Sequence, residues 1–285
     1  MEILHSYRND PALRHSFNAL ARETFGLDFE PFYQNGYWGD DYNPYSAVED
    51  GAVVANVSVN RIGGRLSGDA RRYVQFGTVM TAPAWRGRGL ARALMEAAMR
   101  DCAGCDGFFL FANGGARGFY PKFGFRSAPE RRFFAPVHQD SAFCAETVPM
   151  RTSADRARFL REKNRRGSAG VFQQEADGLL MFYLAQSMRE NVFYLPGLDA
   201  YAVARLSGGC LTLYDVFSPR PVSMERVVRC FGASVTRAEF AFTPRDRTGL
   251  TEYEYTDEDT YFFLCGEPLQ QDMGTILSFP DLAHA

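Results

Sequence analysis

The feature that most constrains the fold is the stretch from Val79 to Arg100, where an apolar strand runs into a glycine-arginine turn and then into a helix. Upstream, Tyr73 to Met80 is rich in β-branched and aromatic residues, and Pro83 ends this strand because proline supplies no ladder donor. Downstream, apolar residues recur at helical spacing from Leu90, which predicts a helix that begins at or just before this residue. The stretch therefore indicates an α/β chain with a ligand-binding turn.

The turn between this strand and this helix suits a phosphate group. Gly87 and Gly89 let the backbone approach a ligand closely, and the first turn of the helix offers N–H groups at the positive end of its dipole. Arg86 and Arg88 add positive charge. Other nucleotide loops do not fit, because no GxxxxGK[ST] is present and Arg92 stands where the dinucleotide fingerprint GxGxxG needs its third glycine.

The hexapeptide Arg86-Gly87-Arg88-Gly89-Leu90-Ala91 resembles the acetyl-coenzyme A signature [RQ]-x-x-G-x-[GA] of the GNAT superfamily of N-acetyltransferases, and it matches at every fixed position. Two segments downstream support the resemblance. Gly107 to Asn113 (GFFLFAN) is typical of the next strand, which often ends in asparagine in the superfamily, and Phe119 to Phe125 (FYPKFGF) resembles the family's F-Y-x-x-x-G-F. The resemblance implies an α/β (α+β) domain with a mixed, mostly antiparallel sheet flanked by helices.

Composition limits the classes of function. The chain has 285 residues, 46% of them hydrophobic, which is enough for a large core and for two domains. A net charge of -3 argues against nucleic acid as a partner. We expect a soluble, cytoplasmic protein with no membrane partner, because no run of eighteen apolar residues occurs. Cys102 and Cys105 form a CxxC without a second pair or nearby histidine, so we expect no metal. Whether the protein forms a homo-oligomer is left open by the sequence.

The second half repeats the order of elements of the first half. A strand-like segment at residues 146–152 is followed by a helical pattern, hairpin strands, a helix and two more strands. We therefore predict two GNAT-like domains, an acetyl-CoA-binding domain over residues 1–145 and a degenerate copy over residues 146–285. At the place of the signature the copy has residues 218–221 (SPRP), which contain no glycine, so we do not expect it to bind the cofactor. The alternative is a single domain with an unrelated tail.

The resemblance implies transfer of an acetyl group from acetyl-CoA to an amine, with cofactor contacts made largely by the backbone. The strand before the turn would pair with the pantetheine arm, and an N–H near Met80 would polarise the thioester carbonyl. The signature would cradle the pyrophosphate. The cofactor-binding residues predicted in this way are Val79, Met80, Thr81, Arg86, Gly87, Arg88, Gly89, Leu90, Ala91 and Asn113.

Tyr120 is the candidate general acid. Coenzyme A leaves as a thiolate whose conjugate acid has a pKa of about 8.5 or a little higher, and a phenol with a pKa of about 10 is a suitable donor. Superfamily members place a tyrosine at this point of the motif for that purpose. The general base stays open. We place Glu49 first because it ends a strand expected to border the cleft, and the alternatives are Asp28, Asp40, Asp41, an ordered water and the Ala285 carboxylate.

The segment from Leu27 to Tyr45 is dense in aromatic and acidic residues. In a GNAT domain this segment covers the acceptor side of the cleft, whereas the alternative is a surface helix packed by its own aromatic side chains. We predict an N-acetyltransferase that acts on a primary amine of a small cationic molecule or of a peptide. The alternative function is a coenzyme A-binding sensor or scaffold without catalysis, and the presence of Tyr120 favours the enzyme.

Overall fold

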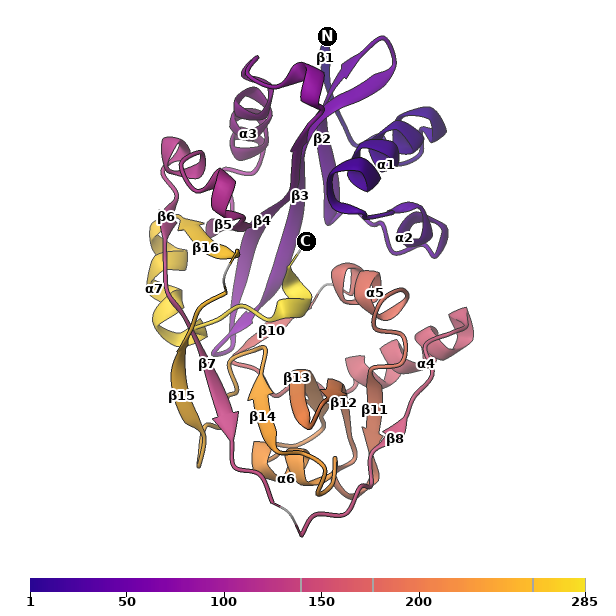
Figure 1. Ribbon diagram of the computed structural model, residues 1–285, viewed down its shortest axis with the longest axis vertical. Helices are drawn as coiled ribbons and strands as arrows, with labels where there is room; N and C mark the ends of the chain where they lie inside the picture. The colour runs from indigo at the N-terminus through magenta and orange to yellow at the C-terminus, as the bar shows by residue number, and fades with distance from the viewer. Residues whose placement is uncertain (139, 176, 258, 285) are drawn as a thin grey trace.

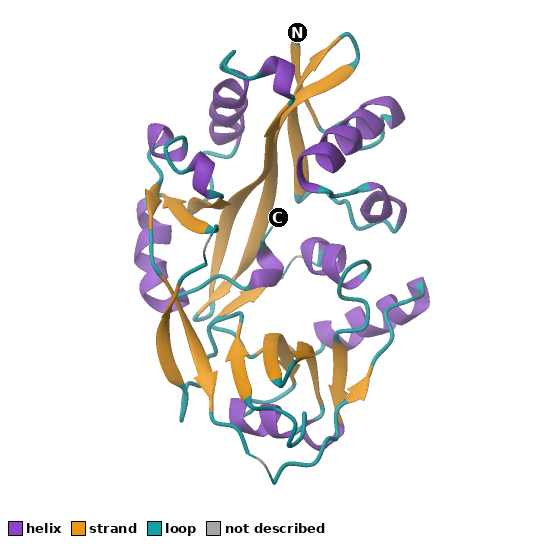
Figure 2. Ribbon diagram, viewed as in Figure 1, coloured by secondary structure: helices purple, strands orange, loops and turns teal. Residues whose placement is uncertain are grey.

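The computed structural model describes residues 1–138, 140–175, 177–257 and 259–284. Within these residues the chain forms two eight-stranded sheets, each flanked by helices (Figures 1 and 2). The strand pairs are antiparallel except for β4 with β5 and β13 with β14 among the strands so described. The predicted α/β class with two mixed, mostly antiparallel sheets is therefore confirmed.

The first sheet has the order β1-β2-β3-β4-β5-β16-β6, with β10 beside β3. Helices α1 and α2 lie on one side of it and α3 on the other (Figure 1). The elements of this part are β1 (Glu2–His5), α1 (Pro11–Phe25), α2 (Glu30–Gln34), β2 (Tyr42–Glu49), β3 (Ala52–Leu66), β4 (Asp69–Thr81), η1 (Pro83–Trp85), α3 (Leu90–Asp101), β5 (Gly107–Ala112), η2 (Gly114–Ala116), η3 (Tyr120–Phe123), β6 (Arg126–Ser127), β10 (Phe172–Gln174), β16 (Tyr261–Cys265) and α7 (Glu267–Ile276).

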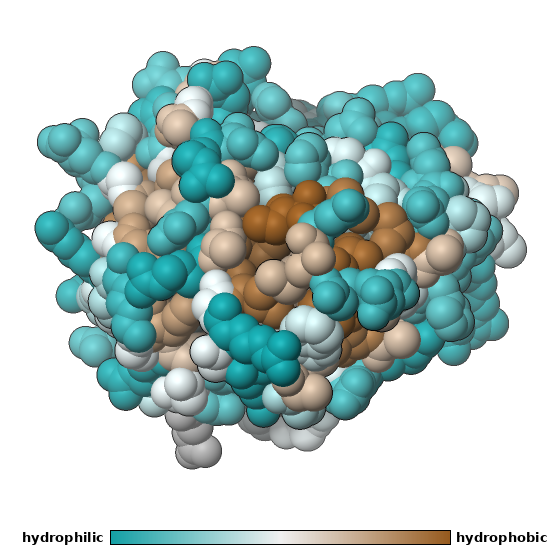
Figure 3. All heavy atoms as spheres, turned by 90° about the horizontal axis from the view of Figure 1, so that it is seen from above, coloured by the Kyte–Doolittle hydropathy of each residue, from teal (hydrophilic) through white to brown (hydrophobic). Residues whose placement is uncertain are grey.

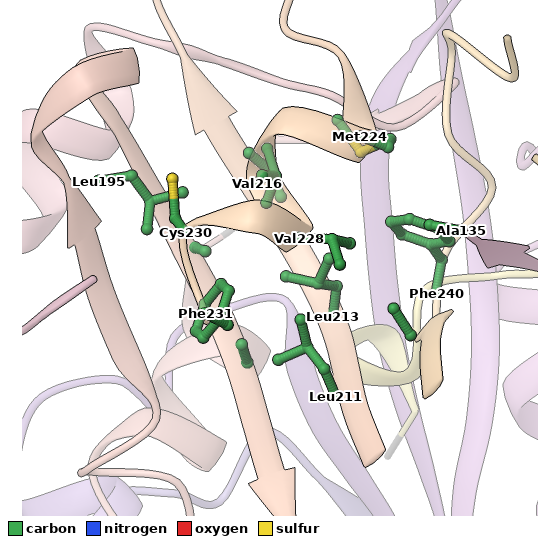
Figure 4. Packing of buried hydrophobic residues seen from close by; sticks show 14 of the residues in the cluster. Ala135, Leu195, Leu211, Leu213, Val216, Met224, Val228, Cys230, Phe231 and Phe240 are labelled. Atoms are coloured by element: carbon green, nitrogen blue, oxygen red, sulfur yellow. The ribbon is translucent and has the colours of Figure 1, made fainter. Parts of the chain in front are cut away.

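The second sheet has the order β15-β7-β14-β13-β12-β11-β8, with β9 beside β13. Its core packs side chains of β13 against α6, with Leu213 and Val216 facing Val228 and Phe231 (Figure 4). The elements of this part are β7 (Glu130–Ala135), β8 (Glu146–Thr147), α4 (Ser153–Asn164), β9 (Gly167–Ser168), α5 (Gly178–Leu184), β11 (Val192–Leu195), η4 (Pro196–Leu198), β12 (Ala200–Ser207), β13 (Cys210–Ser218), α6 (Met224–Arg229), β14 (Arg237–Phe240), β15 (Thr251–Tyr255) and η5 (Asp281–Ala283).

The two sheets exchange strands. β7, from the first half of the chain, joins the second sheet, whereas β10 and β16, from the second half, join the first sheet. At Gly64 the approach of β10 is so close that a Cβ atom would lie 2.5 Å from the carbonyl oxygen of Gln173. Each sheet therefore contains strands from both sides of the predicted boundary between residues 1–145 and 146–285, because strand partners are chosen by tertiary packing as well as by chain order. That division stays a prediction.

The helices that flank the first sheet begin and end at residues with a clear local reason. Asp10 caps α1 by accepting hydrogen bonds from the N–H groups of Ala12 and Leu13, and Gly26, with φ of 70°, ends the helix. α3 begins at Leu90, as predicted. Its buried residues, which include Leu94 and Met95, face the sheet.

The upper end of the molecule carries β1, the β2–β3 hairpin, α1 and α3. Viewed from above, hydrophobic surface gathers near the middle of this face inside a hydrophilic rim (Figure 3). Met1 and Ile3, which lie at this end, are 66% and 45% exposed. Of the helices in the described ranges, none is long and apolar enough to cross a membrane.

Candidate active site

The centre of the first sheet opens into a wedge between β4 and β5. These strands pair in parallel from Tyr73 opposite Gly107 to Phe76 opposite Leu110, and the pairing stops there. Just beyond, β4 carries a bulge against β3, at which Thr78 has φ of 47°. A bulge bends its strand and increases the local twist, so β4 turns away from β5. Among the described residues, the backbone of β4 beyond Phe76 consequently has no paired strand on this side.

A buried polar network holds the bulge from below. The side-chain amide of Asn56 donates to the carbonyl oxygen of Thr78 at 3.0 Å and to the hydroxyl of Ser58 at 2.9 Å, and it accepts from Ser46 at 2.9 Å. The hydroxyl group of Tyr42 lies 2.9 Å from Ser58 and 3.3 Å from the hydroxyl of Thr78. Asn56 is fully buried. The bonds explain how a non-glycine residue keeps a left-handed conformation in the middle of a sheet.

A pocket of about 270 Å³ occupies the wedge. The backbone of β4 around Gly77 and Thr78 forms one of its edges. From the side of the sheet that carries α3 come Ala91, Ala116, Phe119 and Tyr120, and from the opposite side come Phe25, Leu27 and Phe111. The pocket thus reaches both sides of the sheet, so that a ligand on one side can meet a ligand on the other.

The glycine turn lies at one end of this wedge. Gly87 and Gly89 have φ of 75° and 78°, and a Cβ atom at either position would meet nothing within 4 Å. No side chain of the described residues caps α3, so the N–H groups of its first turn remain available for an anion. Arg86 donates from Nε to the carbonyl oxygen of Thr81 at 3.2 Å, and the guanidinium of Arg88 lies 4.6 Å from the centre of the Trp85 ring.

Tyr120 lies in the wall of the pocket. Its side chain is 5% exposed, and its ring contacts Phe119, Phe125 and Phe263. Its hydroxyl group has no hydrogen-bond partner among the residues that the structure describes. Burial raises the pKa of Tyr120 to about 12. The phenol therefore stays protonated at neutral pH, as a general acid must.

The remaining residues predicted to bind the cofactor lie along the same wedge. Val79 and Asn113 line the pocket, whereas the side chain of Met80 is buried on the opposite side with the α1 cluster. Asn113 caps η2, since its Oδ1 atom accepts from the N–H of Ala116 at 3.1 Å. Leu90 is buried at the start of α3 and Ala91 lines the pocket. The predicted cofactor residues thus follow one path from the pocket to the glycine turn.

Glu49, the first candidate for the general base, does not line this pocket. Its carboxylate lies 2.7 Å from the amino group of Met1, at the end of β2. Asp28 and Asp40 are ion-paired with arginines, and Asp41 lines a separate pocket. Ala285, whose carboxylate was the last alternative, lies outside the described residues. The structure therefore brings none of the described acidic candidates together with Tyr120.

Sequence reasoning missed the residues that line the pocket on the α1 side. Phe25, the last residue of α1, was expected to be ordinary core, and Phe111 was only part of a strand, whereas Leu27 begins the segment expected on the acceptor side of the cleft. Phe111 is covered by the C-terminal segment, because the ring of His284 stacks on its ring with the two ring centres 3.5 Å apart. Only the 43% exposure of Phe25, a large apolar side chain at a helix end, distinguishes it from core residues, and exposure cannot be read from a sequence.

The corresponding wedge in the second sheet is closed. β13 and β14 pair in parallel only from Cys210 to Leu213, so β13 also leaves its neighbour. There β9 pairs with β13 at Phe217 and Ser218, and the N–H of Ala169 donates to Val216 at 2.7 Å. The chain's own strand thus takes the place that an extended ligand would need.

The comparisons with known proteins agree with this architecture. Residues 12–125 match the model of the Acetyltransferase (GNAT) family. A comparison with curated proteins gave no match. Among solved structures, a probable N-acyltransferase from Enterococcus faecalis V583, a conserved protein of unknown function, is 13% identical with a TM-score of 0.64, over 96% of this chain and 74% of that one.

Two further structures cover almost all of the chain. Eis1 from Mycobacterium abscessus is 15% identical with a TM-score of 0.54, over 92% of this chain and 72% of that one. A putative acetyltransferase from Pyrococcus horikoshii is 10% identical with a TM-score of 0.54, over 100% of this chain and 95% of that one. At these identities the likeness shows the fold alone. Together with the family match over residues 12–125, it shows a fold of two GNAT-like sheets, the first of which includes the segment that matches the GNAT family model.

Proposed function

We propose that the protein is an acetyl-CoA-dependent N-acetyltransferase with one active site, in the wedge of the first sheet. The observation that carries this proposal is the arrangement around one pocket of about 270 Å³: a strand edge and a glycine turn that the described residues leave unpaired and uncapped, and a buried Tyr120 whose pKa is raised by burial. Each of these features suits one part of acetyl-CoA or one step of the transfer.

The residues of the wedge fit acetyl-CoA. The free edge of β4 can pair with the amide groups of the pantetheine arm, as an added strand would. Gly87 and Gly89 leave the space beside the turn open, and the N–H groups of the first turn of α3 can bind the pyrophosphate. Arg86 and Arg88, with no carboxylate partner in the described part of the chain, would add charge-assisted hydrogen bonds.

The proposed reaction is direct transfer. The nitrogen of the acceptor amine forms a bond to the acetyl carbon, while an N–H of β4 near Met80 stabilises the charge on the carbonyl oxygen. The carbon–sulfur bond then breaks, and Tyr120 donates its proton to the departing thiolate. The amine loses one proton in the course of the transfer, and Tyr120 regains one from solvent. One amide and one thiol are formed.

We propose that the acceptor is a primary amine of a small molecule or of a peptide, reaching the pocket from the side of Phe25, Leu27 and Phe111. These apolar side chains would lower the pKa of a buried amine and so favour its neutral, nucleophilic form. A protein base beside the amine is then less necessary.

A positive charge elsewhere on the acceptor stays a prediction from the sequence. It rests on six acidic residues that precede the glycine turn, Asp28, Glu30, Asp40, Asp41, Glu49 and Asp50. Four of them are ion-paired in the structure: Asp28 with Arg22, Glu30 with Arg14, Asp40 with Arg8, and Glu49 with the amino group of Met1. Their charges are largely neutralised before an acceptor arrives. The contribution of this segment to cation binding is accordingly expected to be small.

The test is release of free thiol from acetyl-CoA in the presence of a panel of polyamines, aminoglycosides, amino acids and peptides. An acetyltransferase releases thiol with at least one amine, and the acetylated amine is identified by mass spectrometry. A protein that binds coenzyme A in calorimetry but releases no thiol with any acceptor would instead be the sensor or scaffold.

A further inference from the structure

The second sheet carries a pocket of about 440 Å³ that the proposed acetyl transfer does not use. Three segments far apart in the chain line it, residues 167–169, 218–222 and 245–246. The middle segment is the loop between β13 and α6. It stands where the first sheet has its glycine turn, between β4 and α3.

The loop has lost the means by which the glycine turn would bind a pyrophosphate. It contains Pro219 and Pro221 in place of glycines, and α6 has only 6 residues. The wedge beside β13 is occupied by β9, and the hydroxyl of Ser168 donates to the buried carboxylate of Asp215 at 2.7 Å. A long ligand that needs a strand edge is therefore excluded, and only a compact ligand can use this pocket.

The charge of the pocket is positive. Arg220 and Arg245 line it from two different segments, and neither forms an ion pair with any residue in the described ranges. The guanidinium group of Arg245 donates a hydrogen bond of 3.4 Å to the carbonyl oxygen of Gly170. Asp246 also lines the pocket, but its carboxylate accepts from the N–H of Thr248 at 3.0 Å. The lining thus carries two guanidinium groups and one carboxylate, so positive charge exceeds negative charge by one.

The pocket is also rigid and partly apolar. Val216 and Met224, which precede and follow the loop, are buried in the core of the second sheet (Figure 4). The two prolines restrict the backbone between them, and Ser218 donates to the carbonyl oxygen of Arg220 at 2.6 Å. Because the walls are already ordered, a ligand loses little affinity to ordering of the loop.

We infer that this pocket binds a compact organic anion, whose phosphate or carboxylate group lies between Arg220 and Arg245 and whose apolar part contacts Pro219, Pro221 and Val222. Arginine recognises both kinds of anion through paired N–H groups. The site is separate from the wedge of the first sheet, and it does not depend on the acetyl transfer proposed above.

The test is calorimetric titration of the full-length chain with inorganic pyrophosphate, and in a second series with succinate, after the first sheet has been saturated with coenzyme A. One molecule of pyrophosphate or of succinate is expected to bind per chain, and the stronger of the two identifies the anion class. Affinity should fall as salt rises, because exposed charges are screened. No heat from either anion at millimolar concentration would overturn the inference.

Variants of the two arginines test whether the measured heat comes from an anion bound in this pocket. Arg220→Ala and Arg245→Ala should each weaken binding by about tenfold, the scale of one charge-assisted hydrogen bond, and the double variant by more. Arg189→Ala removes the same charge from an exposed position without an ion pair in the described structure and should leave binding within twofold. Unchanged affinity of coenzyme A shows that the variants are folded. Wild-type affinity in the double variant would refute the assignment.

Discussion

Asn56 is predicted to hold the wedge open, and its replacement by alanine tests this directly. The substitution removes hydrogen bonds to Thr78, Ser58 and Ser46 in a place where Asn56 is fully buried. Ser46 keeps Tyr7 as a partner and Ser58 keeps Tyr42, but the carbonyl oxygen of Thr78 loses its side-chain donor. An orphaned buried carbonyl costs about 1–3 kcal/mol and each of the other two lost bonds about 1 kcal/mol, so the free energy of unfolding should fall by about 4 kcal/mol.

The measurement is urea denaturation of Asn56→Ala beside the wild type, together with calorimetric titration of coenzyme A. Because the bulge positions the free edge of β4, coenzyme A should bind at least tenfold more weakly. Asn191→Ala is the matched control, since the side chain of Asn191 makes one hydrogen bond among the described residues, to the carbonyl oxygen of Ala204 in the second sheet. It should lose about 1–2 kcal/mol and bind coenzyme A normally. If Asn56→Ala unfolds within 1 kcal/mol of the wild type, the network does not hold the bulge.

The remaining predictions concern the cofactor, the acid and the pH dependence of stability. Gly89→Val should abolish coenzyme A binding without changing the circular dichroism spectrum, because a side chain would fill the space beside the turn. In calorimetric titration the wild type should bind one coenzyme A per chain, and two equivalent sites would contradict the closed second wedge. Tyr120→Phe should keep cofactor affinity and lower turnover by about 10²- to 10⁴-fold, and full turnover would remove Tyr120 as the acid. Burial raises the pKa of Glu130 to about 7, so the folded state binds more protons than the unfolded one and this residue should cause stability to fall as pH rises from about 4.5 through 7. Glu130→Gln should reduce the change of the denaturation midpoint with pH over this range. An unchanged dependence of the midpoint on pH would exclude Glu130 as the group responsible.

Much of the local structure around the wedge of the first sheet could be predicted because its signals are local. Gly87 and Gly89 have left-handed backbone angles that glycine adopts at little cost, and the helix begins at Leu90 where the apolar pattern begins. Tyr120 lies in the pocket wall, as the resemblance to the family implied. Each of these features depends on residues within a few positions of one another.

The positions of the acidic candidates relative to the pocket could not be predicted from local sequence. Glu49 does end a strand, but the ion pair with Met1 holds it outside the pocket, and the register of β2 and β3 decides that position. Phe111 and Phe25 meet at the pocket from different elements, although neither stands in a motif. Proximity of this kind follows from how α1 packs against β3 and β4, which no short segment encodes.

The sequence by itself determined the glycine turn, the helix that follows it, the α/β class and the repeated order of elements, because backbone angles and apolar periodicity depend on near neighbours. Only the tertiary structure decided that β16 pairs with β5, that β7 leaves for the second sheet, and that β9 closes the second wedge. A strand edge offers the same N–H and C=O groups to every partner. Which partner takes it depends on the side chains that are buried on both faces once the whole chain is folded.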